Sequence, residues 1–303
     1  CDTALIYSTK NYYFNNKDRL FGDMGRHNID CKGMIDVLLE NQIPTEVVLT
    51  YKALKNDLSK YRLLVLNNVD VIEPELKSKL IDYVSNGGNL LLAGPDSINL
   101  FNDVLNLKII DKLEAAHFKL LTDNYEVELV GNHAVIDYQN PNKSMYLGDA
   151  TVDLKTASLN PPPTIYFNKL IPSYIKLNYG KGSFRVITFD LGNTYYKEKG
   201  YQLRDFLFEV IKDIPQKLVV KGSHLVDTNI NTKDGKDYIH LMNYGGPHES
   251  TFVKTYDELQ SIYNLEISYE VNKEVKCLTL QPEGLNIPFI KEDYWEGWDD
   301  FEE

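Results

Sequence analysis

Short apolar runs alternate with amphipathic segments over the first half of the chain. The runs Thr3–Tyr7, Tyr61–Leu66 and Asn89–Ala93 are almost wholly apolar, as expected of strands in a sheet that is covered on both faces. Between them, Asp30–Gln42 and Glu73–Ser85 carry apolar residues at helical spacing. A further β-branched run, Glu46–Thr50, follows the first helix. This alternation predicts βαβ units on a parallel sheet.

The pattern loosens after this regular part. Between Leu107 and Asn160 only short extended pieces are found, before a run of three prolines. We interpret residues 107–165 as a possible insertion or an edge region. Two apolar runs, Ser173–Asn178 and Ser183–Phe189, then flank a Tyr-Gly-Lys-Gly sequence, which predicts a β-hairpin. The amphipathic segment Gln202–Ile214 predicts a helix that closes an α/β domain of residues 1–215.

Helical periodicity disappears after Pro215, and only strand patterns remain. The predicted strands are Leu225–Asn231, Asp237–Asn243, Leu265–Val271, Val275–Leu280 and Leu285–Ile290. An Asp-Gly pair at 234–235 predicts a hairpin turn between the first two. Residues 216–303 are therefore predicted to form a second, small all-β sandwich domain.

Charge and composition exclude several classes of protein. The chain has 32 basic and 44 acidic residues, a net charge of −12, which disfavours nucleic acid and anionic membranes as partners. Hydrophobic residues make up 43%, as in globular proteins. No apolar run approaches the roughly 20 residues that span a bilayer. Three scattered cysteines favour free thiols in a reducing compartment, so a soluble, cytoplasmic protein is expected.

No complete catalytic or cofactor motif occurs in the sequence. Neither nucleotide-binding fingerprint, GxGxxG nor GxxxxGK[ST], follows any predicted strand. The closest match to a nucleophile elbow, Ala93–Ser97, has no cysteine and lacks the second glycine. Cys31 and Cys277 are predicted to be core residues, and the six histidines form no metal-binding pattern. We therefore expect no catalytic residue, no metal and no cofactor.

Three segments resemble one family. The segment Tyr61–Gly94, with its strand, polar loop, Pro-Glu-Leu helix, Gly-Gly pair and strand, is similar to the glutamine-amidotransferase-like trimerisation domain of family 42 β-galactosidases. The segment Tyr179–Tyr196 resembles a later part of the same domain, and Lys236–Gly245 resembles a strand of their small C-terminal β domain. The resemblance implies a flavodoxin-like, class I glutamine-amidotransferase-like sheet that has lost its nucleophile, with the catalytic barrel outside this chain.

The resemblance implies a non-catalytic accessory and oligomerisation region of a carbohydrate-degrading enzyme, a β-galactosidase-like glycoside hydrolase. Its implied partners are its own or a neighbouring glycosidase barrel and further copies of the chain, with carbohydrate as a possible ligand. A stand-alone carbohydrate-binding or scaffold module without enzymatic activity is the alternative. A hydrolase with its own active site in the polar loops after the strands is a third hypothesis.

Three loops are candidates for ligand or partner contacts, because open α/β sheets bind ligands at the carboxyl ends of their strands. The first loop, Lys10–Asn28, contributes Tyr12, Tyr13, Arg26 and His27. The second loop, after the strand Tyr61–Leu66, contributes Asn67 and Asn68. The third loop, after the strand Asn89–Ala93, contributes Asp96 and Ser97. We expect these residues to line one rim of the sheet, with Asp96 near Tyr12 or Tyr13. Alternatively, the first loop packs against a barrel or a neighbouring subunit.

Overall fold

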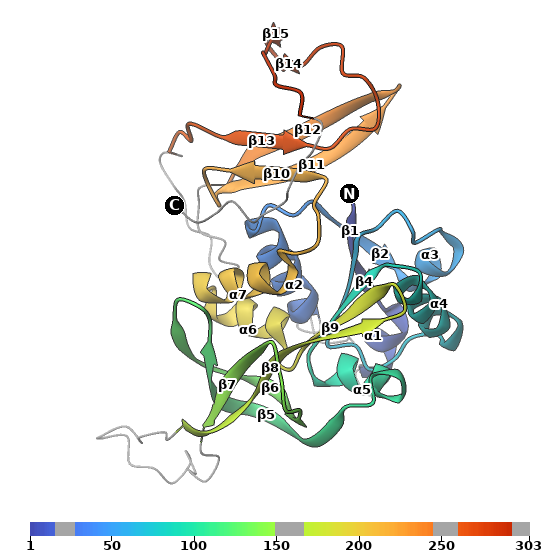
Figure 1. Ribbon diagram of the computed structural model, residues 1–303, viewed down its shortest axis with the longest axis vertical. Helices are drawn as coiled ribbons and strands as arrows, with labels where there is room; N and C mark the ends of the chain where they lie inside the picture. The colour runs from blue at the N-terminus through green and yellow to red at the C-terminus, as the bar shows by residue number, and fades with distance from the viewer. Residues whose placement is uncertain (16–27, 149–166, 245–259, 293–303) are drawn as a thin grey trace.

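The computed structural model describes residues 1–15, 28–148, 167–244 and 260–292 (Figure 1). Its main feature is a nine-stranded sheet of order β2-β1-β3-β4-β9-β8-β7-β5-β6. The first five strands run parallel to one another. They are β2 (Thr45–Leu49), β1 (Thr3–Tyr7), β3 (Leu63–Asn67), β4 (Asn89–Ala93) and β9 (Gly182–Ile187). The predicted α/β class is confirmed.

The rest of the sheet is antiparallel, so the sheet is mixed, whereas the pattern had predicted a parallel one. It consists of β8 (Phe167–Tyr179), β7 (Lys143–Gly148), β5 (Lys108–Leu121) and β6 (Glu126–Asp137). β8 pairs with β9 as the predicted hairpin. The described part of residues 107–165 thus widens the sheet, in strands longer than the pieces predicted. Many of the residues in the first half of β5 are exposed, which weakens the apolar pattern of that strand.

Helices cover both faces of the sheet. They are α1 (Thr9–Asn15), α2 (Ile29–Glu40), α3 (Thr50–Lys55), α4 (Pro74–Ser85), α5 (Pro95–Leu105), α6 (Leu191–Glu198) and α7 (Tyr201–Ile211). Leu63 and Val65 of β3 pack into one core with α2, α6 and α7. Leu64 and Leu66 point to the other core, with α3, α4 and α5. This double coverage explains the continuous apolar runs of β3 and β4.

Four of the helices, α1, α3, α5 and α6, lie where the sequence pattern predicted no helix, and two of them change the candidate site. α1 occupies the start of the predicted Lys10–Asn28 loop, and no residue of α1 is buried. An exposed helix of this kind has no apolar stripe for the pattern to reveal. α5 begins at Pro95, directly after Gly94, which has a φ of +88° and ends β4. Asp96 and Ser97 therefore lie in the first turn of a helix.

Three small antiparallel sheets follow the helix α7, and Figure 1 shows them beside the amino-terminal edge of the parallel strands. They pair β10 (Leu218–Lys221) with β13 (Glu266–Tyr269), β11 (Val226–Lys233) with β12 (Lys236–Asn243), and β14 (Thr279–Leu280) with β15 (Leu285–Asn286). The hairpin turn at Asp234–Gly235 is confirmed, since both residues have a positive φ between β11 and β12.

The core of this β module is small. Leu218, Val220 and Ile230 are its buried members, packed against partly buried neighbours such as Ile239 and Tyr269. The predicted core position of Cys277 is wrong, because this residue is exposed and precedes the two-residue strand β14. Its apolar neighbours in sequence gave a strand pattern, but the described residues provide no partner layer there.

Candidate functional site

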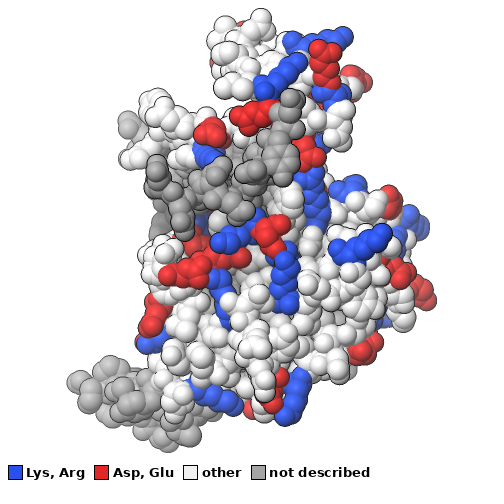
Figure 2. Space-filling model, in the orientation of Figure 1, with Lys and Arg blue, Asp and Glu red and all other residues white. Residues whose placement is uncertain are grey.

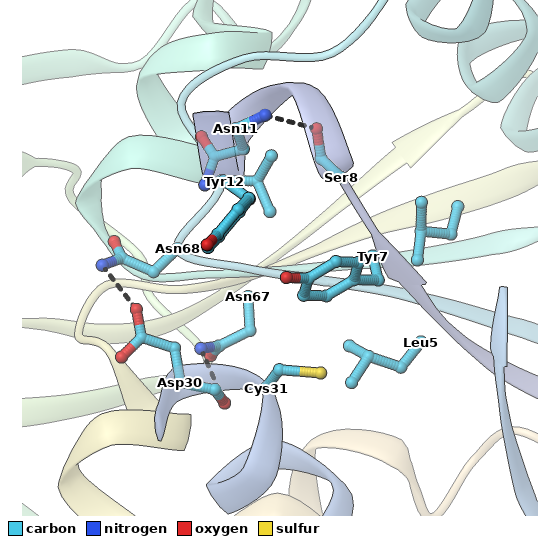
Figure 3. Close-up of a pocket in the computed structure, with 11 residues that line it drawn as sticks. Leu5, Tyr7, Ser8, Asn11, Tyr12, Asp30, Cys31, Asn67 and Asn68 are labelled. Carbon is cyan, nitrogen blue, oxygen red and sulfur yellow. Dashed lines mark hydrogen bonds between the residues drawn. The ribbon is translucent and has the colours of Figure 1, made fainter. Parts of the chain in front are cut away.

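The strands β1, β3, β4 and β9 end at the same edge of the sheet, and a cavity of about 50 Å³ opens there (Figure 3). Tyr7, Tyr12, Asp30, Asn67 and Asn68 are among the residues that line it. Figure 3 shows the two tyrosine hydroxyl groups directed toward the side on which Asn68 and Asp30 lie. The cavity has room for a few water molecules, because one water needs roughly 10–15 Å³ on this measure.

The other predicted site residues lie outside this cavity. Tyr13 is 70% exposed on α1. Ser97 is buried, and its hydroxyl accepts a hydrogen bond of 2.9 Å from the backbone N of Val69, which ties the loop after β3 to α5. Asp96 forms an ion pair of 2.7 Å with Lys112. Arg26 and His27 fall outside the described residues.

Asp96 nevertheless belongs to the same edge. Burial raises the pKa of Asp70 and the Asp96 charge adds to the rise, while Asn15 of α1 donates a hydrogen bond of 3.3 Å to Asp70. The structure therefore brings the loops after β1, β3 and β4 together, with Asp70 between α1 and Asp96.

Asp30, in the first turn of α2, joins this edge to α6. Its carboxylate accepts hydrogen bonds from the side-chain amides of Asn193, at 2.8 Å, and Asn68, at 3.3 Å. Burial raises the pKa of Asp30, and the Asp96 charge adds to the rise, while the two amides and Lys197 oppose it. The two amides thus partly offset the cost of burying this carboxyl group.

Asp190 is the most deeply buried acid of the cluster. Its Oδ1 accepts hydrogen bonds of 3.1 Å from Asn67 Nδ2 and from the backbone N of Asn193, so it caps the N-terminus of α6. Its Oδ2 has no hydrogen-bond partner among the described residues. Burial, with a further contribution from Asp30, raises the pKa of Asp190 to about 8. The Asp190 carboxyl group therefore holds its proton at neutral pH.

Sequence reasoning missed Tyr7, Asp30, Asp70 and Asp190. Open α/β sheets bind ligands at the carboxyl ends of their strands, and Asp190 directly follows the predicted strand Ser183–Phe189. This residue could therefore have been predicted from the sequence. Asp30 could not be found in this way, since it lies at the start of a helix and reaches the edge only through the packing of α2 on α6.

The cluster has hydrogen-bonding groups but no activated nucleophile among the described residues. The thiol of Cys31 is the nearest one, and burial, together with the Asp30 charge, raises its pKa to about 11, so it stays protonated. Within the described ranges, no group of three or more His, Cys, Asp or Glu side chains is arranged to hold a metal ion. The arrangement suits a structural polar network better than covalent catalysis.

Residues 1–98 match the family model of the β-galactosidase trimerisation domain. The resemblance predicted from the sequence is thereby confirmed over this part of the 303-residue chain. No curated protein matches the sequence. No helix of the described residues is long and apolar enough to cross a membrane.

Solved glycosidase structures share the fold. α-L-fucosidase isoenzyme 2 from Paenibacillus thiaminolyticus aligns with a TM-score of 0.68 at 16% identity, covering 96% of this chain and 45% of that one. A GH42 β-galactosidase from G. stearothermophilus aligns with a TM-score of 0.57 at 18% identity, over 80% of this chain and 34% of that one. The β-galactosidase from Bacillus circulans sp. alkalophilus aligns with a TM-score of 0.54 at 13% identity, covering 80% of this chain and 35% of that one. This chain thus spans less than half of each.

Proposed function

We propose that this chain is a non-catalytic accessory and oligomerisation region of a β-galactosidase-like, carbohydrate-degrading enzyme. The observation that carries the proposal is the match of residues 1–98 to the trimerisation domain. The described residues provide no activated nucleophile, which supports the proposal, because Ser97 is engaged with Val69 and the Cys31 thiol stays protonated. The order β2-β1-β3-β4-β9 of the parallel strands supports a flavodoxin-like, amidotransferase-like origin, and the small antiparallel sheets suit a β-sandwich domain.

The proposed partners are copies of this chain and its own or a neighbouring glycosidase barrel, with carbohydrate as a possible ligand. Nucleic acid is disfavoured by the net charge of −12. Figure 2 shows Lys and Arg interspersed with Asp and Glu over the described part of the visible face, so basic charge is not concentrated there. The cytoplasm is the proposed location, because all three cysteines are free thiols.

The open edge of the sheet offers a candidate assembly surface. Val47 on the edge strand β2 is 47% exposed, and Tyr51, just beyond it on α3, is 50% exposed. Both residues lie within the matched segment 1–98. Apolar side chains exposed on an unpaired edge strand favour contact with another chain.

The test is the molar mass of the protein by light scattering after gel filtration. We expect a multiple of 34.8 kDa at high micromolar concentration. The double variant Val47→Glu/Tyr51→Glu should shift the mass toward the monomer, because it places charge on the apolar edge. Leu170→Glu, at a residue 55% exposed on β8, is the matched control and should leave the mass unchanged. A clean wild-type monomer contradicts the assembly role.

Absence of turnover is the second part of the test. We expect no hydrolysis of a panel of nitrophenyl glycosides and no glutaminase activity, because the described residues provide no activated nucleophile. Turnover abolished by one carboxylate or cysteine substitution in this chain would contradict the accessory role.

A further inference from the structure

A large groove lies at the opposite, amino-terminal edge of the sheet, between the α/β part and the β module. Its volume is about 670 Å³, against about 50 Å³ for the cavity at the carboxyl edge. Its walls are formed by Tyr61 and Arg62 before β3, the end of α4, Pro215 after α7, and Glu270 of the β module. Binding sites for small molecules occupy roughly 300–1,000 Å³ and favour such junctions. By size, this groove is the better candidate for a binding site.

Arg62 forms hydrogen bonds across the groove. Its guanidinium donates hydrogen bonds to the backbone oxygen of Pro215 at 3.2 Å and to Glu270 Oε2 at 2.5 Å, and it lies 3.8 Å from Asp2. These contacts join the residue before β3 to Glu270 of the β module and to Pro215, which precedes that module. The positive charge of Arg62 is thus matched by carboxylates of the protein itself.

Lys79 of α4 is also fully engaged. Its ammonium donates to the backbone oxygens of Ala53 and Leu54, each at 2.9 Å, and of Asn56 at 2.5 Å. An ammonium group has three hydrogens to donate, so none remains for a ligand. Lys79 therefore has no hydrogen left to bind an anion, and the charge of Arg62 is already matched by Glu270 and Asp2.

The groups that remain are mostly hydrogen-bond acceptors. Asp82, on the last turns of α4, is exposed, and its carboxylate enters no hydrogen bond or ion pair among the described residues. The neighbouring Asn86 uses one of its two amide hydrogens on the backbone oxygen of Asp82, and its side-chain oxygen remains to accept. Asp57 and Ser59 bond to each other at 2.6 Å. A ligand that donates hydrogen bonds to the Asp82 carboxylate therefore fits this groove.

We propose that this groove binds an uncharged, hydroxyl-rich ligand, a short oligosaccharide. Sugar hydroxyl groups would donate to Asp82 and Asn86, and the apolar C–H face of a ring would lie on the exposed Pro215 and the methylene stem of Arg62. Anionic sugars are excluded, because Asp57, Asp82 and Glu270 would repel them. The inference rests on the carbohydrate ligand named in the proposed function and assigns it a place, whereas the assembly role makes no use of this edge of the sheet.

The test uses the whole chain, with lactose, maltotriose and xylotriose as probes in titration calorimetry and ligand-observed NMR. We expect binding of at least one probe, weakened about tenfold or more by Asp82→Ala, because one hydrogen bond to a charged group is lost. Asn86→Ala should weaken it less. Asp103→Ala removes an exposed carboxylate of α5 that lies outside the groove and should leave the affinity unchanged.

Two outcomes overturn the proposal. The first is that none of the three sugars binds to the wild-type protein. The second is that Asp82→Ala binds the sugar as tightly as the wild type, although the variant unfolds at the same temperature and is therefore intact. Spermidine serves as an organic-cation probe, and Asp82-dependent binding of spermidine in place of the sugars would also overturn it. The molar mass tests the assembly role separately, so either proposal can fail without the other.

Discussion

The two carboxyl oxygens of Asp190 have opposite effects on the stability of the fold. Its Oδ1 caps the helix α6, which stabilises that helix. Its Oδ2 is buried without a partner among the described residues, beside the carboxyl group of Asp30. Ionisation would place a second negative charge in this desolvated region, so the folded protein favours the neutral acid.

Stability should therefore decline as the pH rises. The unfolded chain releases the Asp190 proton near pH 4, whereas the folded chain keeps it up to about pH 8. Between these values the folded state binds the extra proton, so the free energy of unfolding falls with pH, by up to about 1.4 kcal/mol per unit. Asp190→Asn should make this slope clearly smaller, because the amide does not titrate and only the other buried carboxyl groups, such as Asp30, still contribute to it. Urea unfolding at pH 5, 7 and 9 measures it.

The control for this prediction is Asp103→Asn. Its carboxylate is 64% exposed and pairs with Lys77, and exposed pairs contribute only about 0–1 kcal/mol. The control should keep the wild-type dependence on pH. Equal slopes for Asp190→Asn and the wild type would show that Asp190 is already ionised in the folded protein at neutral pH.

At the scale of elements, the contact between α2 and α6 depends on two glycines. A Cβ atom at Gly33 would lie 1.9 Å from the backbone oxygen of Gly192, and one at Gly192 would lie 2.0 Å from the backbone oxygen of Asp30. Only glycine allows the two helices to come this close. The same contact places Asp30 beside Asn193, so the polar cluster depends on it.

Gly33→Ala should destabilise the protein by about 3 kcal/mol or more, at the upper end of the cost of overpacking, because backbone atoms cannot move aside locally. Chemical denaturation measures the loss. Gly200→Ala is the control, since its Cβ would meet only the flexible end of Gln202, at 3.1 Å. The control should cost less than about 1 kcal/mol. Similar losses in both variants would contradict the close helix contact.

At the scale of the whole molecule, apolar burial is distributed unevenly. Two extensive clusters cover the two faces of the large sheet, and all their buried members lie between Ala4 and Ile214. The described part of the β module has one small cluster, with three buried residues. Polar contacts link the two parts, such as Arg62 with Glu270 and the backbone N of Lys217 with Asp2.

This distribution predicts that the two parts differ in their ability to fold alone. Residues 1–215 should unfold in one cooperative transition, because they keep both large cores. Residues 216–303 alone should give no such transition, since two-stranded hairpins with little core are at best marginally stable. Thermal unfolding followed by circular dichroism decides this. A cooperative transition of the second fragment would contradict the prediction.

The sequence by itself determined the elements whose burial is uniform. β1, β3 and β4 are apolar on both faces, and their positions followed from composition alone. The hairpin turns before β9 and β12 were predicted from Gly180 and Gly235, and both glycines have a positive φ in the structure. In contrast, the antiparallel strands β5 and β6 were only partly predicted, because polar residues on their exposed positions break the apolar pattern.

Only the tertiary structure decided the composition of the sites. Asp30 and Asp190 are 160 positions apart, and the helix contact at Gly33 and Gly192 brings them together. The groove at the amino edge likewise exists because Arg62 meets Glu270, more than 200 residues later in the chain. Periodicity reports whether a residue is buried locally. It carries no information about which distant residue lies opposite, because that depends on how complete elements pack.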